Sequence, residues 1–218
     1  MKQFANPLLV AAEWLDEAAR ISTKRNPLAM AIASCTTDGR PSVRMVLAKR
    51  FDEHDGYLVF FTHYGSRKAR ELEATGRAAA TLYWEELGGR QLRLEGPVVR
   101  SPATESADYF ATRPIQSQLN AWVSEQSRTL ESTQALLERC DAKAAELGID
   151  AARRIASVPG PVPCPPHWGG FRIWIDTLEF WTEGAGRFHE RSLYTRTLTR
   201  RSDSEFVASS WQFDQLQP

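Results

Sequence analysis

The chain has 218 residues, with 27 basic and 27 acidic side chains, and its zero net charge argues against a dedicated nucleic-acid-binding protein. No apolar run approaches the roughly 20 residues of a membrane-spanning helix, and the N-terminus lacks a signal-peptide layout. Three widely spaced cysteines form neither a disulfide framework nor a zinc-binding pattern. We therefore expect one globular domain over residues 1–218, in the cytoplasm and away from membranes.

The N-terminal part is predicted to form a helix followed by strands. Hydrophobic periodicity and turn residues place a helix at 6–20 and strands at 28–35, 44–49 and 57–62. In the strand RMVLAK, side chains alternate between two faces, with Arg44 at one end and Lys49 at the other. This strand can therefore offer positive charge at both of its ends.

A basic helix start follows these strands. Ser66 is a favourable N-cap, and the helix is expected to end near Gly76. Arg67, Lys68 and Arg70 occupy its first turn, where the macrodipole is positive and acidic residues are expected. A bound anion such as phosphate would offset this clustering, because free N–H groups also favour an anion there. A solvated basic turn is the alternative.

The middle of the chain is predicted to be a helical insert, at about 101–148, between two sets of strands. Strands are expected at 78–84 and 90–99 before it. Within the insert, Ser101 is the expected N-cap of a helix reaching Arg113, a second helix begins at Ser117, and a third spans 129–147. The third helix has an apolar stripe that is expected to be core: Leu130, Leu137, Ala144 and Leu147. The proline-rich segment 157–170 is expected to be a connector.

The C-terminal part returns to strands, predicted at 171–175, 178–181, 187–195 and near 206–213. In the strand 187–195, alternation would place Arg187, His189 and Arg191 on one face. Six or more short strands joined by tight turns predict a mainly β protein: an antiparallel β-barrel with helices packed outside. An open α+β sheet is the alternative.

The residues that suit chemistry are mainly ligands for anions. The four histidines lack metal-ligand spacing, so no metal site is expected, and phosphate-loop, dinucleotide-binding and hydrolase-elbow motifs are absent. Instead, three clusters combine cations with hydroxyl or aromatic groups: Arg44, Lys49, Ser66, Arg67 and Lys68; Tyr109, Arg113 and Ser117; Arg187, His189 and Arg191 beside Trp181. Two phosphate-sized sites with abundant aromatic rings would suit an enzyme that binds two phosphorylated planar molecules.

Ordered sequence blocks extend this hypothesis. R-M-V-L-x-K, F-x-T-x-x-x-S-R-K, R-Q-L-R-L-E-G, Y-F-x-x-R-P-x-x-S-Q, H-W-G-G-F-R, E-F-W and R-x-H-x-R follow one another in the chain. From about Asn6 to Pro218 the chain resembles the pyridoxamine 5′-phosphate oxidase family. The resemblance implies an FMN-binding split barrel that acts as a homodimer with flavin sites at the subunit interface. It also implies oxidation of pyridoxine or pyridoxamine 5′-phosphate by oxygen to pyridoxal 5′-phosphate, with hydrogen peroxide released.

The resemblance also implies roles for individual residues. The FMN contacts would be Arg44, Met45, Val46, Leu47, Lys49, Phe61, Thr62, Arg67, Lys68, Gln91, Gln126, Ser127, Trp181 and Arg191. The phosphate of the substrate would be bound by Lys49, Tyr109, Arg113 and Ser117. The catalytic residues Arg187 and His189 would lie over the substrate ring. Positioning of the substrate against FMN would supply much of the rate.

Two other functions stay open. One is a flavin oxidase of the same fold that acts on another planar acid, of the phenazine-pathway type. Tyr109, Arg113 and Ser117 favour a phosphorylated substrate over that alternative. The other is a non-catalytic protein that binds FMN or pyridoxal phosphate. In its favour, the chain starts close to its first helix, without the basic N-terminal segment that folds over the substrate in family members.

Overall fold

The computed structural model describes residues 3–150, 160 and 162–218, and the chain divides into two compact units. The sheet unit comprises the segments Met1–Phe60, Glu71–Val99 and Phe171–Pro218. The helical unit comprises the segments Phe61–Arg70 and Arg100–Gly170.

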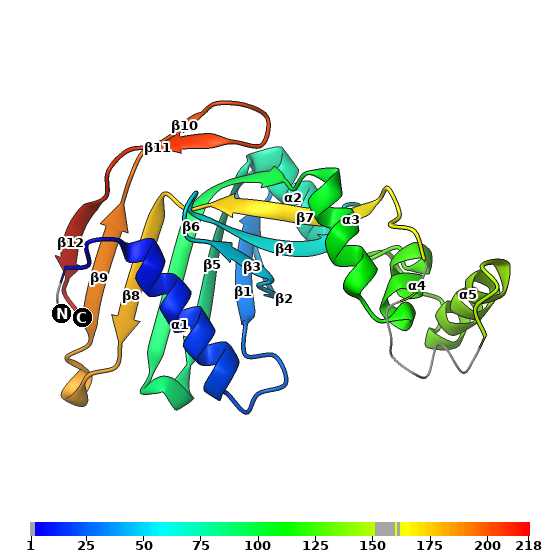
Figure 1. The fold of residues 1–218 in the computed structure, drawn as a ribbon, viewed down its shortest axis with the longest axis horizontal. Coiled ribbons are helices and arrows are strands. Elements are labelled where there is room, and N and C mark those ends of the chain that lie inside the picture. Colours follow the sequence, from blue (N-terminus) through cyan, green and yellow to red (C-terminus); the bar gives the residue numbers. More distant parts are fainter. Residues whose placement is uncertain (1–2, 151–159, 161) are drawn as a thin grey trace. The chain divides into compact units, whose positions relative to one another are not determined.

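The sheet unit is built on a largely antiparallel sheet with the strand order β12-β9-β8-β6-β5-β1-β2 (Figure 1). These strands are β1 (Ala29–Cys35), β2 (Pro41–Leu47), β5 (Arg77–Trp84), β6 (Arg90–Arg100), β8 (Thr177–Thr182), β9 (Glu190–Thr195) and β12 (Gln212–Leu216). Beside this path, β3 (Arg50–Asp52) pairs with β4 (Tyr57–His63), and β7 (Trp168–Trp174) pairs with β4 and β6. A separate ribbon joins β10 (Leu198–Arg200) to β11 (Phe206–Ala208).

Helix α1 (Pro7–Ile21) provides the apolar cover of this sheet, and Figure 1 shows it running across the strands. The Asn6 side chain accepts the Leu8 N–H at 3.0 Å, and Pro7 occupies the first helical position, so the start of the helix is well specified. Trp14 meets Phe180 of β8 edge to face, with ring centroids 5.0 Å apart. Burial of such large side chains contributes roughly 2–3 kcal/mol each and fixes the helix on the sheet.

Three helices form most of the helical unit: α3 (Ala103–Thr112), α4 (Ile115–Val123) and α5 (Thr133–Glu146). Their shared core consists of Phe110, Ile115, Leu119, Ala121, Ala144, Ile149, Val162 and Trp168. Trp168 packs edge to face against Phe110 at 5.0 Å. The helix α2 (Arg67–Thr75) begins in this unit, and the Ser66 hydroxyl accepts the Ala69 N–H at its start, as expected of an N-cap.

Most of the expected elements are confirmed, but the boundaries of the insert helices were wrong in three places. Ser101 does not cap α3: its buried hydroxyl has no hydrogen-bond partner within the described residues, and Pro102 is the N-cap residue. Helix α4 begins at Ile115 rather than Ser117, because Pro114 starts it instead of only ending the previous helix. Helix α5 begins at Thr133, where the Ser132 side chain accepts the Ala135 N–H at 3.0 Å.

The apolar stripe predicted for this last helix was also partly wrong. Leu130 precedes the helix, and it and Leu137 are 43% and 45% exposed, whereas Ala144 is buried. Cys140 is buried in place of the two leucines. The helix thus starts later than predicted, and its buried residues are Cys140 and Ala144.

The C-terminal strands differ from expectation as well. Strand β9 begins at Glu190, so Arg187 and His189 precede the strand and do not share a strand face with Arg191. The strand expected near 206–213 is divided into β11 and β12, and the short β3 and β10 were not predicted. In the expected connector, residues 157–159 and 161 lie outside the described residues.

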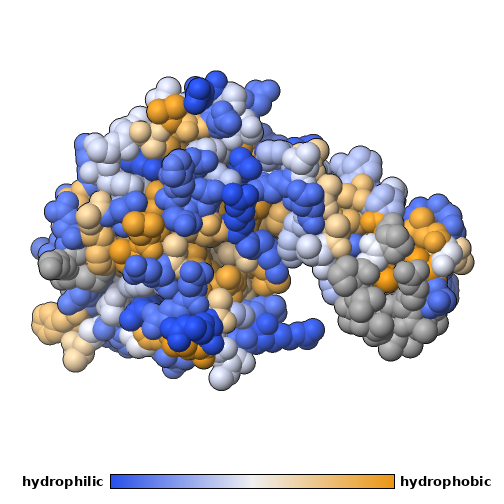
Figure 2. All heavy atoms as spheres, viewed as in Figure 1, coloured by the Kyte–Doolittle hydropathy of each residue, from blue (hydrophilic) through white to orange (hydrophobic). Residues whose placement is uncertain are grey.

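The surface drawn in Figure 2 is mostly polar, with smaller apolar patches between the charged side chains. No helix within the described part of the chain is long and apolar enough to cross a membrane. Within the same residues, no three His, Cys, Asp or Glu side chains are grouped so that they could hold a metal ion.

Candidate active site

A basic cluster at the start of α2 lies within the helical unit. Lys68 is buried, and its Nζ donates to the hydroxyl of Thr62 and to the side-chain oxygen of Gln126, both at 2.9 Å. Ser66 Oγ accepts a longer bond from the same nitrogen at 3.4 Å. Arg67 is exposed at the first helical position. The structure thus brings four predicted FMN contacts together at one helix start, where the macrodipole favours an anion.

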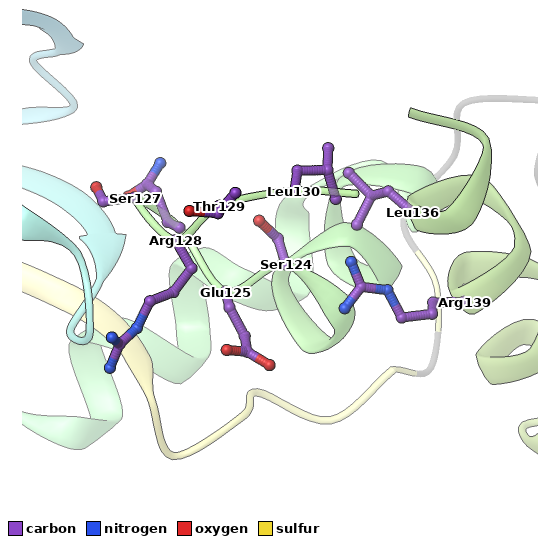
Figure 3. Close-up of a pocket in the computed structure, with 9 residues that line it drawn as sticks. Ser124, Glu125, Ser127, Arg128, Thr129, Leu130, Leu136 and Arg139 are labelled. Atoms are coloured by element: carbon purple, nitrogen blue, oxygen red, sulfur yellow. The ribbon is translucent and has the colours of Figure 1, made fainter. Parts of the chain in front are cut away.

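Ser127 completes this cluster in an uncommon backbone conformation. Its φ is +73°, and its hydroxyl accepts the Arg67 N–H at 3.2 Å. A positive φ costs a residue other than glycine on the order of 1 kcal/mol, so such residues are often found at functional sites. Figure 3 shows Ser127 at one end of a polar pocket of about 260 Å³, with the Arg139 side chain extending from α5 toward Ser124.

A second cluster in the helical unit is a stack of aromatic rings beneath an arginine. Phe61 and Tyr109 stack with ring centroids 4.1 Å apart, and Phe61 also stacks on Trp168 at 5.4 Å. The Arg113 guanidinium lies over the Trp168 ring, 4.6 Å from its centroid. Phe61, predicted to line the flavin ring system, thus lies beside the predicted substrate ligands Tyr109 and Arg113.

Arg113 is a half-buried cation with unused hydrogen-bonding capacity. Its Nη1 atom is buried without a hydrogen-bond partner, and no carboxylate within the described residues pairs with it. Burial lowers the pKa of its guanidinium, while Tyr109 and Cys164 act weakly in the opposite direction. Ser117, the remaining predicted phosphate ligand in this unit, is half-buried near the start of α4. An oxyanion bound to Arg113 would satisfy a donor that the described part of the chain leaves unsatisfied.

In the sheet unit, three predicted FMN contacts form one row across neighbouring strands. Gln91 on β6 lies opposite Trp181 on β8, and Trp181 lies opposite Arg191 on β9. Directly paired residues project from the same face of a sheet, so the three side chains share a face. All three are half-buried.

The cation of this row has a carboxylate partner. Glu179 is buried, and its two oxygens accept from Arg191 Nε at 2.7 Å and from Arg93 Nη1 at 2.6 Å. This pairing raises the pKa of Arg191, chiefly through the hydrogen bond to Glu179. Arg191 Nη1 also donates to the Gln217 carbonyl at 3.2 Å. Arg191 is therefore held in place on its strand.

The predicted catalytic residues Arg187 and His189 lie in the turn before β9. A short 3₁₀ segment, Ala185–Arg187, ends with Arg187 at a φ of +67°, and its side chain is exposed. A Cβ at Gly184 would collide with the Phe188 carbonyl oxygen, so this tight turn requires glycine there. His189 lies 4.5 Å from Trp181 between ring centroids, and its Nδ1 lies 3.3 Å from the Gly184 nitrogen. That N–H can donate only to an unprotonated Nδ1, which leaves the ring proton on Nε2.

Strand β2 carries the remaining predicted flavin contacts. Met45 is 63% exposed, while Val46 and Leu47 are half-buried. Lys49, just past the strand, is exposed, and its backbone N–H donates to the Val59 carbonyl at 2.9 Å. Arg44 faces the interior and pairs with Glu71 at 3.1 Å. Strand β2 is the edge strand in the order of the sheet.

Several residues in these clusters were not predicted from the sequence. Glu71 and Glu179 each pair with a predicted site arginine, and Trp168 supports Arg113. Glu179 lies two positions before Trp181 in a predicted strand, so alternation alone could have placed it on the same face. Trp168 belongs to the H-W-G-G-F-R block. No sequence pattern indicated the pairing of Glu71 with Arg44.

Comparisons with known proteins bear on these clusters. The sequence profile described as "Pyridoxamine 5'-phosphate oxidase" matches residues 16–140. A second profile, "Pyridoxine 5'-phosphate oxidase C-terminal dimerisation region", matches residues 168–218. The chain belongs to the pyridoxamine 5′-phosphate oxidase family. The family is one of oxidoreductases, and the resemblance noted from the sequence blocks is confirmed.

Curated relatives cover most of the chain. A pyridoxine/pyridoxamine 5′-phosphate oxidase from Rubrobacter xylanophilus is 46% identical over 191 residues, 88% of this chain and 82% of the relative. A protein of the same name from Paracoccus denitrificans is 38% identical over 222 residues, which cover 98% of this chain and 95% of the relative.

Solved structures confirm the fold class. PhzG from Burkholderia lata, in complex with tetrahydrophenazine-1-carboxylic acid, has 30% identity and a TM-score of 0.79 over all of this chain and 95% of that protein. A pyridoxamine 5′-phosphate oxidase-related, FMN-binding protein from Nostoc punctiforme has 15% identity and a TM-score of 0.67, over 99% of each chain. The fold is that of the FMN-binding split-barrel proteins: a largely antiparallel sheet with accompanying helices.

Proposed function

We propose that the protein is an FMN-dependent oxidase. It converts pyridoxine or pyridoxamine 5′-phosphate to pyridoxal 5′-phosphate, uses oxygen as electron acceptor and releases hydrogen peroxide. With the pyridoxamine substrate, water supplies the aldehyde oxygen and the nitrogen leaves as ammonia. The names of the curated relatives support the reaction. The observation that carries the choice of substrate is Arg113, a cation on an aromatic stack with a buried nitrogen that has no hydrogen-bond partner among the described residues. A phosphate ester supplies the oxygen atoms that this group lacks.

The residues at the start of α2 fit the phosphate of FMN. Lys68 is a buried cation, Arg67 adds charge at the helix N-terminus, and the hydroxyls of Ser66 and Ser127 lie beside them. Backbone N–H groups and cations at a helix start are a recurrent phosphate-binding arrangement. When bound, FMN would supply the two-electron chemistry that no side chain can perform.

The protein's own residues then bind and orient the substrate. The phosphate of the substrate is bound by Arg113, Tyr109, Ser117 and Lys49, which anchors one end of the molecule and so restricts where the carbon to be oxidised can lie. Arg187 lies over the ring and stabilises negative charge on it. His189 presents the Nε2 proton as a hydrogen-bond donor, because its Nδ1 faces the Gly184 N–H.

The proposed active form is a homodimer with flavin sites at the subunit interface. The match of residues 168–218 to a dimerisation region supports this assembly. Gln91, Trp181 and Arg191 project together from the sheet and would contact the flavin there. Light scattering of the purified protein at several concentrations measures the assembly directly, and a monomer at all concentrations would contradict it.

An anaerobic absorbance experiment tests the proposed reaction. The purified protein is expected to show flavin bands that bleach when pyridoxamine or pyridoxine 5′-phosphate is added and return when oxygen is admitted. One hydrogen peroxide should form for each pyridoxal 5′-phosphate. Unphosphorylated pyridoxamine is the matched control and should bleach the flavin far more slowly. Bound flavin that stays oxidised with both phosphorylated substrates would refute the proposal.

A further inference from the structure

A buried carboxylate fixes the side chain of Arg44 in the sheet unit. Glu71 on α2 is only 6% exposed, and its Oε2 accepts from Arg44 Nη2 at 3.1 Å. The Ser34 hydroxyl on β1 donates to the same Oε2 at 2.6 Å and accepts from Arg44 Nη1 at 2.6 Å. The three side chains thus form a closed ring of hydrogen bonds.

This ring uses only part of the guanidinium. Arg44 Nη1 also donates to the Ile32 carbonyl at 3.3 Å, so three of its hydrogen bonds go to described residues. A guanidinium carries five N–H donors. The Nε donor and one Nη2 donor therefore remain unused by the described residues, and they lie along one edge of the planar group. Such an edge matches two oxygens of a phosphate or carboxylate.

Stability alone is a weak explanation for the arrangement. A buried ion pair costs desolvation of both charges and often contributes no more than well-packed apolar side chains of similar volume. The ring does provide a fixed orientation, because the Arg44 side chain is bound by Ser34 on β1, by Glu71 on α2 and by the Ile32 carbonyl. The pairing of β1 and β2 places Arg44 directly opposite Ile32. An arginine held at one edge keeps the other edge preorganised for a ligand.

We propose that Glu71, assisted by Ser34, is a positioning residue that holds the free edge of Arg44 toward the phosphate of FMN. This inference rests on the proposed function. The phosphate is chosen because it is the one anionic group of oxidised FMN, and because the free edge of Arg44 presents two donors side by side. Glu71 acts through Arg44 and does not touch the flavin.

Electrostatics alone predicts the opposite outcome, which makes the inference testable. Removing a negative charge beside Arg44 should strengthen the binding of an anion if charge alone mattered. If orientation matters, Glu71→Gln should weaken FMN binding despite the gain in local positive charge. We expect the FMN dissociation constant to rise about tenfold, which corresponds to about 1.4 kcal/mol.

The experiment titrates FMN and riboflavin into the full chain after the flavin has been removed, and follows flavin fluorescence. Riboflavin lacks the phosphate, so its dissociation constant should change less than about twofold in Glu71→Gln. Glu73→Gln is the matched control: it makes the same charge change on the exposed face of α2 and should leave both affinities unchanged. Ser34→Ala removes the bridging hydroxyl without a charge change and should weaken FMN binding about threefold.

Several outcomes would overturn the inference. Unchanged or tighter FMN binding by folded Glu71→Gln would refute it, and so would an equal loss for FMN and riboflavin, which indicates general distortion. If Glu71→Gln does not fold, Ser34→Ala decides by the same FMN-to-riboflavin comparison. A wild-type protein that binds no FMN would refute the proposed function as well, so the two failures are distinguishable.

Discussion

Arg113 and Arg191 are both predicted site residues, but their surroundings differ in a way that separates two tasks. Arg113 in the helical unit lies half-buried over Trp168 without a carboxylate partner among the described residues, and partial burial lowers the pKa of its guanidinium. Arg191 in the sheet unit pairs with Glu179, and this hydrogen bond raises its pKa. The first cation retains its charge for a ligand, whereas the charge of the second is largely balanced within the protein.

The difference indicates how a chain with zero net charge can prepare a local anion site. A partly desolvated cation on aromatic rings gains the most binding free energy from a phosphate, because neither its charge nor its buried donor is already paired with a carboxylate. A cation already bound to a buried carboxylate gains less and serves mainly to hold a position. The comparison therefore predicts separable effects on substrate binding, flavin binding and turnover.

The largest expected effect comes from Arg187, the exposed arginine of the turn before β9. It resembles neither Arg113 nor Arg191 in its surroundings. Arg187→Ala should lower kcat by about 1,000-fold, because it removes charge stabilisation at the substrate ring. FMN should stay bound, since the proposed flavin contacts are intact. Stopped-flow reduction of the flavin measures the first effect, and the flavin-to-protein absorbance ratio measures the second. Turnover at the wild-type rate would refute the assigned role.

Arg113→Met sharpens the comparison from the substrate side. The methionine retains the apolar contact with Trp168 but removes the cation, so KM for the phosphorylated substrate should rise about 100-fold, equivalent to about 2.7 kcal/mol. FMN affinity should be unchanged. Arg100→Met is the control, because Arg100 also lies over an aromatic ring, 4.0 Å from the centroid of Tyr64. Equal effects of the two substitutions on KM would contradict the proposal that Arg113 binds the substrate phosphate.

Glu179→Gln tests the balanced cation of the sheet unit. It leaves Arg93 and Arg191 without their carboxylate, so the free energy of unfolding should fall by about 2 kcal/mol. KM for the substrate should change little, because Glu179 binds Arg93 and Arg191 and, within the part of the chain that the structure describes, pairs with no proposed substrate ligand. Chemical denaturation and steady-state kinetics check the two expectations. A rise in KM comparable to that of Arg113→Met would contradict the separation of tasks.

The smallest expected effect concerns pH. His63 in the helical unit has a lowered pKa, because of burial first and then because of His167 and Lys68, with Glu125 acting in the opposite direction. Its Nδ1 accepts the Gly65 N–H at 2.9 Å, which only the unprotonated nitrogen can do. The unfolded chain therefore binds the proton more readily, and stability should fall as pH decreases through the ordinary histidine pKa of 6.5.

His63→Asn isolates this contribution. An asparagine oxygen can accept the same N–H two residues ahead but does not titrate. The melting temperature of the variant should depend less on pH than that of the wild type between about pH 5.5 and pH 7.5, the window around the ordinary histidine pKa. Parallel pH profiles for the two proteins would show that His63 does not contribute.

The sequence was sufficient to predict most of the longer strands, the sheet-rich fold and the helix that starts at Arg67, because periodicity and turn residues are local signals. The ordered blocks predicted the family. The turn at Arg187 was predicted wrongly as strand, since alternation of Arg187, His189 and Arg191 looks the same in a strand and in the irregular segment found here. The pairing of Arg44 with Glu71 joins residues 27 apart in the chain, and no local rule reports such a contact.

Ser127 has a consequence for how this protein tolerates sequence variation. Its positive φ suits glycine and, less well, asparagine or aspartate, while its hydroxyl is needed to accept the Arg67 N–H. Glycine would relieve the backbone but leave the helix start without this acceptor, and an acidic side chain would compete with the phosphate proposed to bind there. Glycine and aspartate, which suit the backbone conformation, lack a suitable neutral acceptor, and other residues with a hydroxyl do not suit the positive φ. Position 127 should therefore accept very few residues in a functional chain.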